Sequence, residues 1–129
     1  MKPTTREWVK KAENDFKVAC QILRRRKEIV PDAACFHCQQ CVEKYLKARL
    51  LEAGIGFPRT HDLLQLLIAC LPVEPLWSAY SKVVDGMTAM PWTSATPVTA
   101  PYCAKPNWHS SKHCRSLRAE ARRSLGLRK

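Results

Sequence analysis

The stretch Cys35-Phe36-His37-Cys38-Gln39-Gln40-Cys41-Val42-Glu43-Lys44-Tyr45-Leu46-Lys47-Ala48 decides the fold of this 129-residue chain. Read at 3.6 residues per turn, it forms one helix with two faces. Aromatic, aliphatic and cysteine side chains fall on one face. The other face collects mainly amides and charges, at positions 39, 40, 43, 44 and 47. A helix with this much apolar surface needs partners on more than one flank, so we expect it to be the central helix of a small bundle.

The patterns on either side predict further helices of the same bundle. Thr5 and Thr60 are suitable N-cap residues, and Gly54 is a suitable C-terminal stop. Short links make antiparallel neighbours the default arrangement. We therefore expect an all-α, up-and-down antiparallel bundle of four or five helices, forming a single domain over residues 1–129. The expected helices lie near residues 5–26, 31–53, 61–71, 74–85 and 111–125.

The formal net charge is +11, and it is unevenly distributed. Residues 101–129 contain eight Lys or Arg against the single acid Glu120, and Arg24–Lys27 form a second basic run. Such patches favour anionic partners, either nucleic acid, nucleotide phosphates or an acidic protein. The alternative for Arg24–Lys27 is a solvated helix end, where basic residues are favourable.

The sequence has no candidate membrane segment. No stretch approaches the roughly 20 apolar residues of a membrane span. The residues Met1–Arg6 lead into an amphipathic helix and not into the apolar core of a signal peptide. We expect a cytoplasmic protein without membrane association.

Seven cysteines raise the question of a metal site. The spacing Cys35-x-x-Cys38-x-x-Cys41 resembles part of an iron–sulfur run, but the fourth cysteine followed by proline is missing. On a helix these three sulfurs also point in diverging directions. Reduced cysteine is a common small core residue, so we expect core packing, with no metal and no cofactor. A second set lacks the paired-cysteine half of a zinc finger: Cys103, His109, His113 and Cys114.

Three blocks of sequence resemble a known family. They are Ala12-Glu13-x-Asp15-Phe16-x-x-Ala19, the His37-x-Gln39-Gln40-x-x-Glu43-Lys44 core of the central stretch, and Thr60-His61-Asp62-Leu63. Together they resemble a HEPN domain (higher eukaryotes and prokaryotes nucleotide-binding) over about residues 5–85. The resemblance implies a helical bundle that forms a homodimer. It also implies nucleotide or RNA binding, and pairing with a nucleotidyltransferase-domain protein in toxin–antitoxin or defence systems.

One feature of the family is missing. Its ribonuclease branch carries Arg, four to six residues, then His, a pair suited to acid–base work on RNA. Here Arg26 precedes His37 by too many residues, and Arg59 precedes His61 by too few. The Arg-Tyr-Pro element of the other branch is also absent. We therefore predict no catalytic residue and favour a non-enzymatic binding module. The alternative is a metal-independent HEPN endoribonuclease toxin.

Residues 87–113 break the helical pattern. Four prolines and many Thr and Ser residues predict an irregular segment. If the codons around residues 95–99 are read in the frame that starts at each third base, they can encode Arg-Tyr-Pro-Gly-Asp. A paired frameshift is therefore one hypothesis. An ordinary Pro-rich loop is the other. Shortening of the last helix should expose Leu and Trp surface, which favours dimerisation, partner docking or poor solubility.

The candidate site residues lie on the central helix and just before the third. Side chains at 37, 40, 44 and 47 share one helical row, and its lysines suit phosphate as point charges. The alternative is a solvated face with a Glu43–Lys47 pair. A helix N-terminus can hold an anion, although capping is the alternative role there. For Asp15 we expect an ion pair in preference to catalysis. The nucleotide- or anion-binding candidates are His37, Gln40, Lys44, Lys47, Thr60 and His61.

Overall fold

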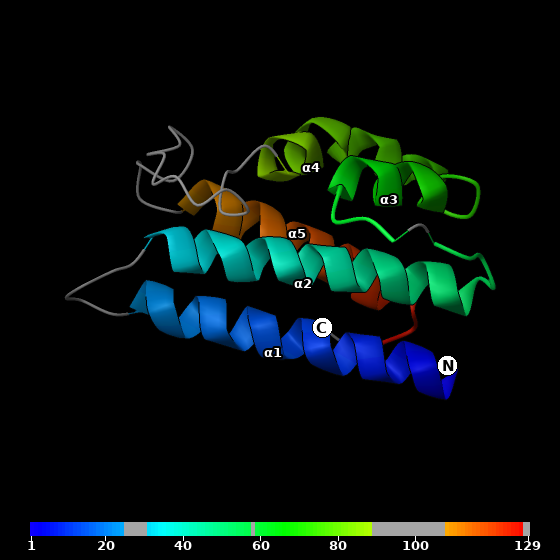
Figure 1. The fold of residues 1–129 in the computed structure, drawn as a ribbon, viewed down its shortest axis with the longest axis horizontal. Helices are drawn as coiled ribbons and strands as arrows, with labels where there is room; N and C mark the ends of the chain where they lie inside the picture. The colour runs from blue at the N-terminus through cyan, green and yellow to red at the C-terminus, as the bar shows by residue number, and fades with distance from the viewer. Residues whose placement is uncertain (25–30, 58, 89–107, 128–129) are drawn as a thin grey trace.

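The structure, a computed structural model, describes residues 1–24, 31–57, 59–88 and 108–127. In these ranges every regular element is helical, which confirms the all-α prediction (Figure 1). The elements are α1 (Pro3–Arg24), α2 (Pro31–Glu52), α3 (Leu63–Cys70), the 3-10 helix η1 (Pro75–Tyr80), α4 (Ser81–Thr88) and α5 (Trp108–Ser124).

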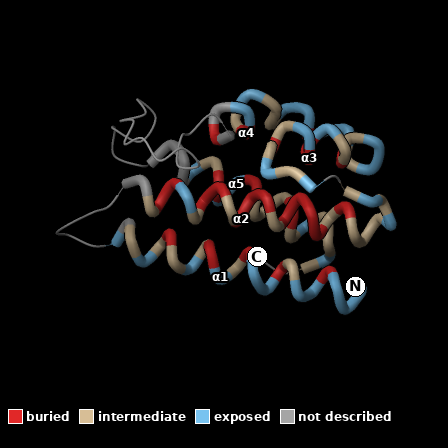
Figure 2. The backbone as a smooth tube through the Cα atoms, in the orientation of Figure 1, coloured by how far each residue is buried: buried red, intermediate tan, exposed pale blue. Residues whose placement is uncertain are grey.

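Helix α2 is the central helix, as predicted. It runs antiparallel to α1 along the long axis of the molecule, and α5 packs behind it (Figure 1). Helices α3 and α4, with η1 between them in the chain, cover a further side of the bundle. Buried residues run along most of α2 in Figure 2. Its core side chains include Val42, Tyr45, Leu46 and Leu50.

The alternative considered for α2, a solvated face with a Glu43–Lys47 pair, is right about the pair and wrong about the solvation. Gln39, Glu43 and Lys47 are all buried. The reason is that α1, α3, α4 and α5 all contact this helix, so little of its circumference faces water. Buried charges need partners, and these partners define the candidate site below.

The starts of two helices depart from the prediction: α1 begins at Pro3, so the predicted N-cap Thr5 lies inside the helix, and at α3 two capping residues compete. Helix α3 begins at Leu63, because the Asp62 side chain accepts a hydrogen bond from the Leu64 backbone N–H at 3.0 Å. The predicted cap Thr60 instead accepts from the Asp62 backbone N–H, also at 3.0 Å. Gly54 has a φ of +74°, which confirms the predicted stop after α2.

The segment predicted to be irregular, 87–113, is helical at both ends. Helix α4 continues to Thr88 and buries Met87, and α5 begins at Trp108. No proline lies in these flanks, so nothing prevents helix there. Residues 89–107, with all four prolines, lie outside the described residues, as does Cys103.

Helix α5 closes the bundle more fully than the sequence indicated. Leu117 and Ala121 are buried in the shared core. The expected exposure of Leu and Trp surface holds for Leu76, which is 86 % exposed. It is wrong for Trp77, which is buried. Among the described helices, none is both long and apolar enough to cross a bilayer.

Candidate functional site

Asp15 of α1 forms the first polar network with α2. Its Oδ1 lies 2.8 Å from Nδ1 of His37, and its Oδ2 accepts a hydrogen bond from Nζ of Lys44. His37 and Lys44 are seven residues apart, close to two helical turns, so both reach the same carboxylate. This confirms the ion pair predicted for Asp15. Because a carboxylate accepts a hydrogen bond from Nδ1, it holds the hydrogen on that nitrogen. In the neutral ring Nε2 is then the hydrogen-bond acceptor.

Glu43 of α2 forms the second network and is 3 % exposed. Its Oε1 accepts from Lys47 Nζ at 2.7 Å and lies 2.9 Å from His61 Nδ1. Its Oε2 accepts from Gln40 Nε2 at 3.3 Å. Since His61 belongs to the segment before α3 and its side chain is 78 % exposed, this contact ties that segment to α2.

The Lys47 ammonium is enclosed by further groups. Its Nζ lies 5.4 Å from the ring centroid of Trp8 and 5.5 Å from that of Phe57. Lys47 itself is 8 % exposed. A carboxylate and two aromatic faces therefore compensate the desolvation of this charge.

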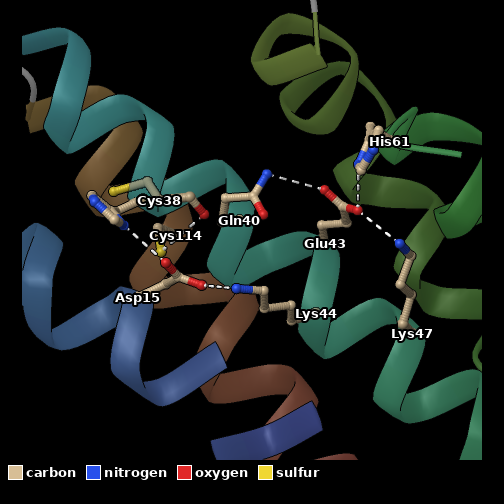
Figure 3. Close-up of polar contacts among 9 residues, drawn as sticks. Asp15, Cys38, Gln40, Glu43, Lys44, Lys47, His61 and Cys114 are labelled. Atoms are coloured by element: carbon tan, nitrogen blue, oxygen red, sulfur yellow. Dashed lines mark hydrogen bonds and ion pairs between the residues drawn. The ribbon is translucent and has the colours of Figure 1, made fainter. Parts of the chain in front are cut away.

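The row predicted to line one groove is divided between the two networks (Figure 3). Two of its four members contact Asp15 and the other two contact Glu43. Each lysine charge is met by a carboxylate, so neither is an uncompensated charge for phosphate. At the N-terminus of α3, the Asp62 carboxylate already takes the capping role. Thr60 accepts a hydrogen bond from the Asp62 backbone N–H, so Thr60 and Asp62 have the capping role given above as the alternative to anion binding.

Glu13 forms a third network that the sequence reasoning missed. Arg118 of α5 donates to both Glu13 oxygens, at 2.7 and 2.5 Å, and Tyr45 of α2 donates at 2.7 Å. Burial opposes ionisation of Glu13, but these hydrogen bonds outweigh it and hold the pKa of the carboxyl below its usual value. Nothing local to Glu13 signals this contact, because Arg118 lies 105 residues away in the sequence.

The family model for the HEPN domain matches residues 5–124. The chain belongs to the HEPN family. No curated protein and no solved structure gives a significant match. The match extends past residue 85, where the sequence resemblance ended, and reaches the end of α5. All three carboxylate networks therefore lie inside the HEPN domain.

Two cysteines of α2, Cys38 and Cys41, pack against Cys114 where α2 meets α5. Cys35, Cys38 and Cys41 are buried, which confirms the predicted core role. Cys114 of α5 is buried as well, and its Sγ lies 3.7 Å from the Cys38 carbonyl oxygen (Figure 3). A hydrogen bond with Cys114, together with burial, raises the pKa of the Cys38 thiol. Among the described residues, no group of three or more His, Cys, Asp or Glu is arranged to hold a metal ion.

The chemistry open to the HEPN site follows from these contacts. The polar partners of both His37 and His61 in the described ranges are carboxylates. A histidine held by a carboxylate can accept or donate a proton at Nε2. Phosphate binding, in contrast, needs a cation whose charge is not already cancelled. The two networks therefore contain histidines that can transfer a proton, but no unpaired cation that could bind phosphate.

Proposed function

We propose that this HEPN domain is a non-catalytic module that binds a phosphate-bearing ligand, either a nucleotide or RNA. The observation that carries the non-catalytic part of the proposal is that Asp15 and Glu43 each hold one histidine and one lysine. RNA cleavage without a metal needs a base for the 2′-hydroxyl and a cation on the phosphate, held together. Here the lysines beside the histidines are neutralised. The net charge of +11 still supports attraction to a polyanion.

The proposal includes a partner and an assembly. Family membership supports pairing with a nucleotidyltransferase-domain protein of a toxin–antitoxin or defence system, in the cytoplasm. It also supports a homodimer, and the exposed Leu76 and Ile68 offer apolar surface for association. Light scattering after gel filtration should give about twice the 14.7 kDa chain mass. A mass of one chain at micromolar concentration would contradict the dimer.

A metal-independent endoribonuclease is the second candidate, favoured by one contact. Asp15 holds His37 at Nδ1 and so orients Nε2 as a general base, while Lys44 lies on the same carboxylate. This triplet differs from the Arg…His pair of the family. Lysine is a compact point charge without the bidentate fork of arginine, so it clamps a phosphate less specifically.

One experiment separates the two candidates. Pure protein is incubated with end-labelled RNA in EDTA, as wild type, as His37→Ala, and as His61→Ala for a control histidine. Binding without cleavage in all three is the expected result. Cleavage that disappears in His37→Ala and persists in His61→Ala would establish the enzyme. Absence of both binding and cleavage would remove RNA as the ligand.

A further inference from the structure

An open groove lies between α1 and α5, apart from the Asp15 and Glu43 networks. Its volume is about 540 Å³, and it is open to solvent along one side. Four cations line it, two from each helix. They are Lys17 and Arg24 of α1, and Arg115 and Arg118 of α5. Among its described lining residues, the single acid is Glu13.

The charges in this groove do not cancel. Arg118 is engaged by Glu13 and lies over the ring of Phe16, 4.3 Å from its centroid. A second arginine, Arg122, also donates to Glu13, at 3.1 Å. Glu13 is therefore satisfied and has no charge left for the remaining cations of the groove.

The three remaining cations of the groove are exposed and uncompensated. Within the described part of the chain, Lys17, Arg24 and Arg115 form no ion pair. This is the reverse of the α2 row, where each lysine is paired. Three unpaired cations facing one concave space raise the local concentration of anions.

The size and spacing of the groove fit a chain of phosphates. Lys17 and Arg24 are seven residues apart, a rise of about 10 Å along α1. Arg115 comes from the opposite wall. The volume falls within the roughly 300–1,000 Å³ typical of small-ligand sites. Arginine suits a nucleotide or RNA phosphate, because its planar fork can bind two phosphate oxygens and its face can stack on a base.

We infer that the α1–α5 groove binds consecutive phosphates, those of a nucleoside triphosphate or of a single RNA strand. The inference rests on the proposed function and assigns it a place. Lys17, Arg24 and Arg115 contact phosphate oxygens directly. Arg118 stays on Glu13 and shapes the wall between α1 and α5. The lysines of α2 then have a structural role only.

The test compares two variants that remove equal charge. Lys17→Ala/Arg115→Ala empties the groove of two exposed cations. Lys10→Ala/Lys82→Ala removes two exposed lysines that do not line it. Fluorescence anisotropy measures binding of a labelled 12-nucleotide single-stranded RNA, with ATP, inorganic phosphate and polyglutamate as competitors. All four mutated side chains are exposed, and circular dichroism with a urea midpoint verifies that each variant is folded.

The groove variant should bind the RNA at least about tenfold more weakly, the loss of one charge-assisted hydrogen bond or more. The control variant should stay within about threefold of wild type, as expected for removing rim charges. If ATP displaces the RNA at concentrations where inorganic phosphate has no effect, the groove is assigned to nucleotides. If neither ATP nor inorganic phosphate displaces the RNA, the groove is assigned to the RNA strand. Equal losses in both variants would overturn the groove while leaving the proposed function standing. Polyglutamate competing as well as RNA would overturn the phosphate assignment. If wild type binds neither the RNA nor a fluorescently labelled ATP, both the groove and the proposed function are overturned.

Discussion

The Glu43 carboxylate provides the sharpest stability test, because it is 3 % exposed and neutralises a buried lysine. Glu43→Gln keeps the size of the side chain and removes its charge. Lys47, 8 % exposed, then loses its counter-ion and keeps only aromatic neighbours. Removing one partner of a buried pair costs about 3–5 kcal/mol. We expect about 3 kcal/mol here, since the rings of Trp8 and Phe57 retain part of the cation's stabilisation.

The assay is urea unfolding followed by circular dichroism, in a double-mutant cycle with Lys47→Met. Because the double variant has no buried charge at either position, it should be more stable than the two single losses added together predict, by about 1–3 kcal/mol. Glu120→Gln is the matched control, since its partner Arg123 is 76 % exposed; its cost should stay below about 0.5 kcal/mol. A Glu43→Gln cost as small as that of the control, or strict additivity in the cycle, would refute the buried-network reasoning.

The remaining predictions concern pH, thiols and the segment between α4 and α5. The depressed pKa of Glu13 contributes stability that is present above pH about 4.5 and is lost as pH falls through the folded-state pKa. Glu13→Gln should therefore flatten the decline of the urea midpoint below pH about 4.5. An unchanged pH profile would exclude the Arg118 contact. Burial raises the pKa of the Cys70 thiol to about 12, so at pH 8 a thiol reagent mapped by mass spectrometry should label the half-buried Cys20 well before Cys70, and equal rates would contradict the buried placement. Purified protein should carry less than one equivalent of zinc or iron, whereas stoichiometric metal lost on replacing the cysteines of α2 would overturn their core role. Amide exchange should be fast across residues 89–107 and slow in α2, and a continuous protected helix in that segment would refute the Pro-rich reading.

Local sequence patterns predicted the helices well and their buried charges poorly. The dense apolar residues of α2 identified the central helix, because only a helix covered on several sides can carry them. The same pattern placed Glu43 and Lys47 on a solvated face, since helical periodicity says nothing about which neighbouring helix covers a polar position. The start of α3 was misjudged because Thr60 and Asp62 are both capable caps, and geometry alone selects Asp62.

The candidate site was predicted in its residues and not in its connections. Asp15 was expected to form an ion pair, but its partners lie 22 and 29 residues away on another helix, where no local rule assigns them. The α1–α5 groove depends on contacts across about 100 residues, such as Glu13 with Arg118. Basic runs at 24–27 and after residue 101 signalled an anionic partner. The fold was needed to show which cations remain unpaired.

The salt dependence of RNA binding by the wild-type protein tests the central claim most directly. Anisotropy titrations between 25 and 200 mM salt, with the RNA run on a denaturing gel afterwards, give both the affinity and the integrity of the strand. Three phosphate contacts predict a slope of about −2 for log K against log salt, with the RNA intact. A slope near zero, or RNA cleaved in the presence of EDTA, would contradict a non-catalytic phosphate-binding module.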